Sequence, residues 1–413
     1  MSDYGIAVDI GTTTVSLSLF DKVKGKRVKL VSFKNPQSQF GEDVISRIKH
    51  QDENRDVCDL SLLIRESISA QITKLLKISQ IQPSKVSDVV IVGNTPMHHL
   101  FFDLPTSSLL KEPYTIKHTE SIVIHPDELG IDLPEASCYA PPLIESFVGS
   151  DALGVIIGFG LANNVDPSLT LDIGTNSEII VQAYEKIWVA SAASGPAFEG
   201  MSLSCGMIAD KGAIDRVEYQ HSLRTLSVNT IGNISPTGIC GVGAISALHE
   251  FRRANWITKE GSINRNILSK YIYNQNSVYG ILIDDTNTHS PIYLTQLDIR
   301  LLQQSKAAIR TVIDLLFEES NCDSRDIRNL HITGAFGNGL DVNAAVHIGM
   351  IPALHNLRGT LQKLGGALLG AELIIWFQRI RSEVDEIYKS IKYVDMMSHP
   401  QFSELHSKYS LFP

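Results

Sequence analysis

The sequence predicts an α/β protein with two domains of related design, and three observations support this. The segment at residues 8–15, VDIGTTTV, returns in altered form at residues 171–178 as LDIGTNSE. In each copy an apolar run ends at Asp and Gly, small polar residues follow and a second apolar run begins, which indicates a strand, a tight turn and a strand. Both copies are followed by strand-like and helical patterns. The 413 residues with 43% hydrophobic content are enough for two or more cores, so we expect domains at 1–165 and 166–413.

Strands and helices alternate along the first predicted domain. Apolar residues recur at helical spacing across residues 59–79, and the run at 89–92 predicts a buried strand that ends at Gly93. A helix followed by a strand indicates a crossover connection onto a sheet. Residues 103–143 are richer in proline and polar residues, so we expect a smaller inserted or peripheral lobe there. The other elements expected here are strands at 4–9, 13–20 and 28–34, a helical region beginning near Gly41 and a helix at 152–161.

The second domain is predicted to continue this alternation. A long amphipathic helix is expected at 295–319, and the strand at 330–333 ends in a glycine-rich turn at 334–339. A helix capped near Asp341 should follow. The remaining expectations are a glycine-rich turn at 238–243 that opens a helix at 244–253, a variable stretch to about 291, a helix within 365–380 and a polar tail.

The two repeated turns have the composition of phosphate-binding loops. Gly11 and Gly174 can adopt backbone angles closed to other residues, while nearby N–H groups and hydroxyls can donate hydrogen bonds to phosphate oxygens. Asp9 and Asp172 end the preceding strands and suit a hydrated Mg²⁺, which needs only one or two carboxylates. Two ordinary Asp-Gly hairpin turns are the alternative, which the presence of two copies disfavours. The predicted phosphate ligands are Gly11, Thr12, Thr13, Thr14, Gly174, Thr175 and Asn176.

Composition argues against several classes of function. The net charge of −9 disfavours nucleic-acid binding, and no apolar run is long enough to cross a membrane. A cytoplasmic location is therefore expected. The five cysteines are scattered without a C-x-x-C pair, so neither a disulfide framework nor an iron–sulfur cluster is expected in this chain. Cys205 and Cys240 are interpreted as small buried side chains, with a redox role as the alternative.

The order of these features resembles the superfamily of actin, sugar kinases and heat-shock chaperone ATPases. This resemblance implies two RNase H-like domains that flank a nucleotide cleft. Within the superfamily, the chain resembles the ATPase portion of the reductive activators of corrinoid proteins, from its first residues to its tail. The motifs that carry this narrower resemblance are Asn35-Pro36-Gln37 with residues 41–48 (GEDVISRI), 93–99 (GNTPMHH), 194–200 (SGPAFEG), 204–207 (SCGM), 238–241 (GICG) and 334–338 (GAFGN).

The narrower resemblance implies an activity, partners and cofactors. In that family, ATP turnover with Mg²⁺ is coupled to reduction of an inactive Co(II) corrinoid on a partner protein to Co(I). These activators usually carry an N-terminal ferredoxin-like domain with a [2Fe–2S] cluster, whereas this chain begins at the first ATPase strand. The electron carrier is expected to be supplied by another protein, for which a separate ferredoxin is possible; the alternatives are that the domain has been removed from this sequence or that the protein does something else. Homodimer formation is left open. The alternatives are a nucleotide-dependent regulatory or binding protein with little turnover, and a small-molecule kinase of the same superfamily.

The resemblance also implies roles for single residues. Asp151 would position the attacking water, with an N-cap role for its helix as the alternative. Asp9 and Asp172 would hold Mg²⁺ through its waters while the two hairpins clamp the β- and γ-phosphates. Gly195 belongs to a third phosphate loop, in which Glu199 is interpreted as a turn residue rather than a Mg²⁺ contact. Gly241 and Gly243 are predicted to contact the nucleotide at a helix N-terminus. Lys306 is predicted to lie beside the purine, with a solvated position on its helix as the alternative. The residues predicted to form an adenosine motif are Gly334, Ala335, Gly337 and Asn338.

The adjacent residues His98 and His99 raise the question of a metal or cobalt ligand, since imidazole can serve as either. Neighbouring residues on a helix or strand face different directions, and no third ligand lies at a suitable spacing. A metal role is therefore disfavoured.

Overall fold

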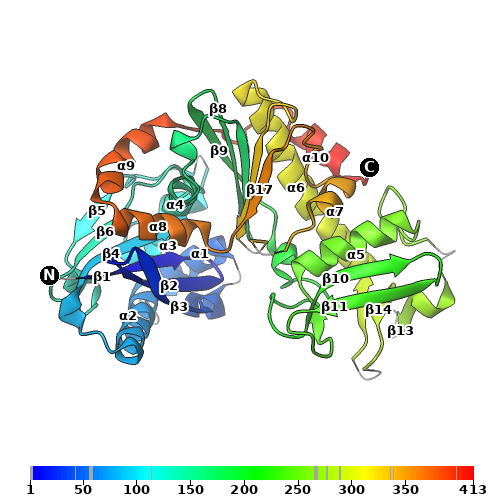
Figure 1. Ribbon diagram of the computed structural model, residues 1–413, viewed down its shortest axis with the longest axis horizontal. Coiled ribbons are helices and arrows are strands. Elements are labelled where there is room, and N and C mark those ends of the chain that lie inside the picture. Colours follow the sequence, from blue (N-terminus) through cyan, green and yellow to red (C-terminus); the bar gives the residue numbers. More distant parts are fainter. Residues whose placement is uncertain are drawn as a thin grey trace. The chain divides into compact units, whose positions relative to one another are not determined.

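The computed structural model describes residues 3–41, 43–54, 59–112, 114–264, 268–275, 278–287, 290–334, 336–337, 339–396 and 398–413. The chain forms two compact units (Figure 1). The first unit contains Met1–Asn164, Glu185–Ile187 and Gly365–Tyr393, and the second contains Val165–Tyr184, Trp188–Leu364 and Val394–Pro413. The division near residue 165 lies beside the predicted boundary, but residues 365–393 return to the first unit.

A six-stranded sheet forms the centre of the first unit, in the order β3-β2-β1-β4-β6-β5. β1 pairs antiparallel with β2 and parallel with β4, so the predicted hairpin and the predicted crossover strand are neighbours. The segment predicted as a peripheral lobe supplies β5 and β6 to one edge of this sheet. The strands are β1 (Tyr4–Ile10), β2 (Thr14–Asp21), β3 (Lys26–Lys34), β4 (Val86–Gly93), β5 (Ile122–Ile124) and β6 (Ser137–Ala140). The helices are α1 (Val44–Asn54), α2 (Leu60–Ser79), α3 (Thr95–Phe102), α4 (Ser150–Gly158), α8 (Gly366–Trp376) and α9 (Gln378–Ser390), with the short strand β18 at Ile391–Tyr393.

One face of this sheet is covered by α2 (Figure 1). Asp59 caps that helix by accepting from the backbone N–H of Ser61, and its apolar residues at spacings of four pack against alternate residues of β1. These buried side chains include Ile64, Ile68 and Ile72 of α2 and Ile6, Val8 and Ile10 of β1. The periodicity at 59–79 therefore correctly predicted both the helix and its buried face.

The α8 helix, from the predicted 365–380 region, packs against β1, β4 and α4 of the first unit. Glycines allow the backbones of α4 and α8 to approach closely, because a Cβ on Gly154 would lie 2.8 Å from the carbonyl oxygen of Ala367. Glu372 of α8 is buried and accepts from Nε of Arg27 at 2.6 Å and from the hydroxyl of Ser18. These long-range contacts explain why residues 365–393 join the first unit.

The second unit repeats the strand arrangement of the first. Five strands of its main sheet follow the order β17-β16-β7-β8-β9, in which β7 pairs antiparallel with β8 and parallel with β16. The two copies of the repeated segment therefore occupy equivalent places, because these five strands correspond to β6-β4-β1-β2-β3 of the first sheet. The strands are β7 (Ser168–Ile173), β8 (Ser177–Ala183), β9 (Lys186–Ala192), β16 (Asn329–Gly334) and β17 (Gly359–Gln362).

Two smaller sheets and several α-helices complete the described part of the second unit. The sheets contain β10 (Ala213–Gln220), β11 (Thr225–Thr230) and β12 (Gly238–Ile239), and β13 (Ile272–Gln275), β14 (Val278–Asp284) and β15 (Ile292–Thr295). The helices are α5 (Gly241–Arg253), α6 (Gln296–Ser320), α7 (Val342–His347) and α10 (Phe402–Ser410). The predicted Asp341 cap is confirmed, since its side chain accepts from the N–H groups of Asn343 and Ala344. The residues predicted only as a polar tail contain α10.

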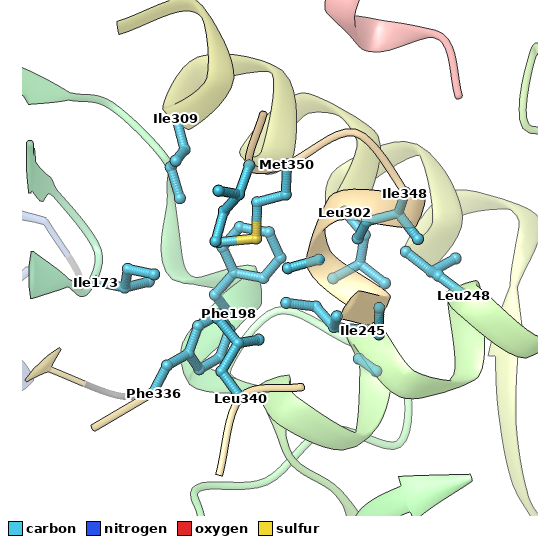
Figure 2. Close-up of a cluster of buried hydrophobic side chains, with 14 of the residues drawn as sticks. Ile173, Phe198, Ile245, Leu248, Leu302, Ile309, Phe336, Leu340, Ile348 and Met350 are labelled. Atoms are coloured by element: carbon cyan, nitrogen blue, oxygen red, sulfur yellow. The ribbon is translucent and has the colours of Figure 1, made fainter. Parts of the chain in front are cut away.

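The core of the second unit anchors two loops that carry predicted site residues. Figure 2 shows Phe198, which follows Gly195, beside Phe336 of the turn after β16. Their ring centroids lie 5.3 Å apart, and both side chains are buried. Aliphatic side chains from α5 and α6 surround them, including Ile245 and Leu302 (Figure 2). Apolar burial therefore holds both loops against the same core.

Candidate functional site

The first predicted phosphate turn is a β-hairpin between β1 and β2. Ile10 pairs with Val15, and the N–H of Gly11 donates to the carbonyl oxygen of Thr14 at 3.0 Å. A Cβ at Gly11 would lie 2.6 Å from that oxygen, so the tight turn needs glycine. The predicted strand, turn and strand are confirmed, and Thr12 and Thr13 form the rest of the turn.

The end of β4 contributes a second group beside this hairpin. β1 and β4 are parallel, and Ile10 pairs with Gly93 at their carboxyl ends. Asn94, the next residue, caps α3 with its side-chain oxygen and donates from Nδ2 to the hydroxyl of Thr12 at 3.0 Å. In open α/β sheets, ligands bind at the carboxyl ends of such strands, which favours this edge as part of a site.

Asp151 lies in the first turn of α4, which begins at the same edge of the sheet. Ser150 donates to the carbonyl oxygen of Gly93 at 3.3 Å, and the Asp151 carboxylate accepts from the N–H of Ala152 at 2.8 Å. Desolvation by the surrounding protein raises the pKa of Asp151 to about 6, although nearby backbone N–H groups oppose the rise. The alternative N-cap role is wrong, because Gly149 occupies the N-cap position.

The second predicted phosphate turn is the hairpin between β7 and β8. Asp172 pairs with Glu178, and Gly174, Thr175 and Asn176 form the turn. The hydroxyl of Thr175 donates to Oε2 of Glu199 at 2.6 Å. This contact gives Glu199 a structural role in the turn, as the sequence favoured, and links the hairpin to the loop at 194–200.

That third loop rests directly on the second hairpin. The hydroxyl of Ser194 lies 2.7 Å from that of Ser177 and donates to the carbonyl oxygen of Gly174 at 3.0 Å. Gly195 follows with a φ of 71°, and the space in which its Cβ would lie is open. The loop therefore approaches the turn closely and leaves room beside Gly195.

Gly334 lies beside Asp172 at the carboxyl ends of β16 and β7. The strands are parallel, with Thr333 opposite Asp172. Gly334 has a φ of 71°, and a Cβ there would lie 2.6 Å from Oδ1 of Asp172 and would also collide with the carbonyl oxygen of Ile173. A larger residue at this position would therefore clash with the carboxylate and with the backbone of β7.

The other glycines predicted to contact the nucleotide in the second unit are closely packed against backbone atoms. Gly241 and Gly243 lie in the first turn of α5, where a Cβ would collide with the carbonyl oxygens of Phe198 and Ile214. Gly337 is equally confined, because its Cβ would lie 2.6 Å from the backbone nitrogen of Leu364. Close packing accounts for these glycines, and their nucleotide contacts stay predictions. Ala335 and Asn338 lie outside the described residues.

Lys306 is buried rather than solvated. Its ammonium donates to the carbonyl oxygens of Tyr409 and Leu411 at 2.5 and 2.7 Å and lies 5.1 Å from the centre of the Phe412 ring. Burial, aided by the charge of Arg310, lowers the pKa of Lys306 to about 7. These contacts favour a structural role in holding residues 409–412 against α6, and the purine contact stays a prediction.

The cysteines and histidines singled out in the sequence are mainly buried. Cys205 and Cys240 are free thiols whose pKa values are raised, chiefly by burial, which favours the packing interpretation. Burial also lowers the pKa of His98 to about 3, and His99 Nδ1 lies 3.0 Å from the carbonyl oxygen of Thr95. Within the described part of the chain, no three His, Cys, Asp or Glu side chains are grouped as a metal site requires.

Three residues near the first hairpin were missed as site candidates. Asn35 and Arg47 donate to carbonyl oxygens of the turn, and Asn94 donates to the Thr12 hydroxyl. Each is distant from the turn in sequence. The signal that could have found them is their place in the motifs that carried the family resemblance, in which Asn35 precedes Pro36, Asn94 follows Gly93 and Arg47 belongs to residues 41–48.

Comparison with known proteins identifies the family. Residues 4–164 match the RACo middle region, and residues 166–413 match the C-terminal domain of RACo, the ASKHA domain. The corrinoid activation enzyme RamQ of Eubacterium limosum is 32% identical over 422 residues, covering 99% of this chain and 70% of that protein. A [Co(II) methylated amine-specific corrinoid protein] reductase of Methanosarcina barkeri is 25% identical over 395 residues, covering 84% of this chain and 66% of that protein.

A solved structure shows that the similarity extends to the fold. The reductive activator for corrinoid, iron-sulfur protein superimposes with a TM-score of 0.89 at 30% identity, covering 99% of this chain and 66% of that chain. The chain thus spans between 66% and 70% of the lengths of these three proteins. No helix in the ranges that the structure describes is long and apolar enough to cross a membrane. The chain belongs to the RACo family of reductive activators of corrinoid proteins and has its actin-like ATPase fold.

Proposed function

We propose that this protein hydrolyses ATP with Mg²⁺ and couples the hydrolysis to reduction of a Co(II) corrinoid on a partner protein. One electron from a ferredoxin-type protein converts Co(II) to Co(I), while ATP is hydrolysed to ADP and phosphate. This proposal is supported by two relatives, one named a corrinoid activation enzyme and the other a corrinoid protein reductase. The structural observation that carries the nucleotide part is the pair of Asp-Gly hairpins, in which Asp9 and Asp172 lie near the ends of β1 and β7 directly before the turns.

The residues at the hairpins fit a magnesium-dependent nucleotide site. Asp9 and Asp172 are half-buried carboxylates at the ends of β1 and β7, and carboxylate oxygens are the ligands that Mg²⁺ prefers. A Cβ at position 334 would lie 2.6 Å from Oδ1 of Asp172, so glycine at this position prevents a clash with the carboxylate. When bound, Mg²⁺ would neutralise charge on the β- and γ-phosphates. Each carboxylate is suited to orient water ligands of the ion, and the N–H groups of each turn are suited to hold phosphate oxygens.

Asp151 is the residue best suited to the attacking water. Its raised pKa means that at neutral pH the carboxylate is ionised and still a better proton acceptor than an ordinary aspartate. Its position in the first turn of α4, beside the carboxyl ends of β1 and β4, places it on the same edge of the sheet as the first hairpin. We assign it the role of hydrogen-bonding and orienting water for attack on the γ-phosphate.

The experiment is an ATPase assay with Mg²⁺ on the wild-type protein, Asp172→Ala, Asp151→Ala and the control Asp132→Ala, which changes an exposed aspartate of the first unit. Each is assayed alone and with a Co(II) corrinoid protein and a reduced ferredoxin, while the visible spectrum reports Co(I). We expect the corrinoid protein to stimulate turnover in the wild type and the control, with Co(I) appearing in both. Both site variants should lose turnover and Co(I) formation.

Two results would contradict the proposal. If the wild-type protein binds ATP but neither turnover nor cobalt reduction responds to the corrinoid protein, the coupling is absent, and a nucleotide-dependent regulatory protein becomes the better account. If Asp172→Ala retains full turnover, the assigned site is wrong even though the activity exists.

A further inference from the structure

Arg47 of α1 is buried beneath the first hairpin, although it is a charged side chain. Only 1% of its surface is exposed. Its Nη1 donates to the carbonyl oxygen of Thr12 at 2.5 Å, and its Nε donates to that of Gly41 at 2.8 Å. Burial lowers the pKa of Arg47 to about 10, so the guanidinium stays charged at neutral pH. A buried cation is expensive to retain, which suggests that its charge serves a purpose at this place.

Asn35, which caps the 3-10 helix Pro36–Phe40 after β3, binds the same turn. It is fully buried, its Nδ2 donates to the carbonyl oxygen of Gly11 at 2.9 Å, and its backbone N–H donates to that of Thr13 at 2.8 Å. Its side-chain oxygen accepts from the N–H of Gln37 at 3.0 Å, which fixes the orientation of the amide. Asn35 and Arg47 together therefore bind the carbonyl oxygens of Gly11, Thr12 and Thr13.

Because the peptide bond is planar, hydrogen bonds to the carbonyl oxygens of the turn also fix the direction in which its N–H groups point. In a trans peptide, the carbonyl of one residue and the N–H of the next point in opposite directions. Because the Gly11 carbonyl points toward Asn35, the N–H of Thr12 points away from it. The N–H of Thr13 likewise points away from Arg47. Successive N–H groups that point to one side of a turn form an anion-binding concavity.

We propose that Arg47 and Asn35 are positioning residues for phosphate binding, which act through the carbonyl oxygens of the first turn. They aim the N–H groups of Thr12 and Thr13 at a phosphate of the nucleotide, and the Arg47 charge polarises the peptide between these two threonines so that its N–H donates more strongly. This inference rests on the proposed function, because it needs a nucleotide phosphate at the turn. It goes beyond that function by assigning the geometry of the turn to two buried side chains that do not touch the ligand.

The test compares ligands that share adenosine but differ in phosphate. Affinities of ATP and adenosine are measured by calorimetry for the wild-type protein, Arg47→Met, Arg47→Lys and Asn35→Asp. Arg65→Met is the matched control, because Arg65 also donates to a backbone carbonyl in the first unit, that of Phe101 at 2.6 Å, away from the turn. Thermal unfolding and circular dichroism establish that each variant is folded.

We expect Arg47→Met to weaken ATP binding by about tenfold or more while adenosine affinity stays within about twofold, because one misdirected charge-assisted hydrogen bond costs about a factor of ten. Arg47→Lys should recover part of the loss, since lysine keeps the charge but cannot reproduce both fixed donor directions. Asn35→Asp nearly preserves side-chain shape but removes the donor to Gly11, and should also weaken ATP selectively. Arg65→Met should change neither affinity.

Each of the other possible results refutes either the nucleotide site or the positioning role of Arg47 and Asn35. If the wild-type protein binds ATP no more tightly than adenosine, the proposed nucleotide site fails, and this inference fails with it. If the wild type prefers ATP and both Arg47→Lys and Asn35→Asp keep that preference, only the positioning role is refuted. The same holds if ATP and adenosine weaken equally in the folded variants, because that pattern indicates a general structural role. Should Arg47→Met not fold, Arg47→Lys and Asn35→Asp decide the question.

Discussion

Replacing Asp151 by asparagine should stabilise the protein at neutral pH and abolish ATP hydrolysis. Burial raises the pKa of the Asp151 carboxyl from 3.8 to about 6. A tenfold change in an acid constant is worth about 1.4 kcal/mol, so the ionised carboxylate lowers the free energy of unfolding at pH 7 by about 3 kcal/mol. Asparagine carries no charge but retains one oxygen that can accept from Ala152. Since the side chain is partly exposed and asparagine loses one acceptor, we expect a net gain of about 1–2 kcal/mol.

The sign of this effect depends on pH. Below 3.8 the carboxyl is protonated in both the folded and the unfolded chain, so it imposes no ionisation cost. Between 3.8 and about 6 the unfolded chain releases a proton that the folded chain keeps, so stability falls as pH rises. Above that range the cost is constant. The stability advantage of Asp151→Asn over the wild type should therefore grow between pH 4 and pH 7 and then level off.

Chemical denaturation of the wild-type protein, Asp151→Asn and the exposed control Asp132→Asn at a series of pH values measures this advantage. A steady-state pH profile should show wild-type turnover falling to half near pH 6, because the protonated carboxyl cannot accept a proton from water. An Asp151→Asn protein that is less stable than the wild type at pH 7 would refute the reasoning, as would a wild-type profile that is flat through pH 6.

Three further predictions concern other buried or strained residues. Above pH 7 the free energy of unfolding of the wild type should rise relative to that of Lys306→Met by up to about 1.4 kcal/mol per pH unit. The reason is that Lys306 has released its proton in the folded chain but keeps it in the unfolded chain. Denaturation at pH 6–9 tests this. Gly334→Ala should weaken Mg-ATP binding, measured by calorimetry, at least about tenfold. The control is Gly130→Ala, because Gly130 also has a positive φ but has open space where its Cβ would lie. This control should lose only about 1–2 kcal/mol of stability, measured by thermal melting. His98→Leu should unfold at the same temperature as the wild type or a higher one, because neither ring nitrogen of His98 has a hydrogen-bond partner among the described residues. His99→Leu should unfold at a lower temperature, because it loses the contact between Nδ1 and the carbonyl oxygen of Thr95.

Local patterns predicted the elements that carry the candidate site. The two Asp-Gly turns lie between apolar runs, and both are hairpins at equivalent positions of two similar sheets. The Asp341 cap and the helix at 59–79 were likewise correct, because caps and amphipathic helices depend on residues a few positions apart. The alternative interpretation of Asp151 as an N-cap was wrong by two positions, since Gly149 occupies that place.

Long-range packing determined what these patterns could not predict. The helix at 366–376 joins the first unit because Glu372 binds Arg27 and because glycines let α4 and α8 approach each other. Lys306 was expected on a nucleotide-facing or solvated surface, yet it binds the backbone of residues 409–411. Neither contact leaves a periodic signal, because the partners are about a hundred or more residues apart.

The sequence by itself determined the two Asp-Gly hairpins, the order of strands and helices around them and, through its motifs, the family. These features depend on turn chemistry and on periodicity over a few residues. Only the tertiary structure decided which side chains support each turn, as Arg47 and Asn35 do at the first hairpin and Ser194 and Glu199 do at the second. The physical reason is that a turn supplies N–H donors from its own residues, while the groups that bind its carbonyls and hydroxyls come from distant parts of the chain that only folding brings into contact.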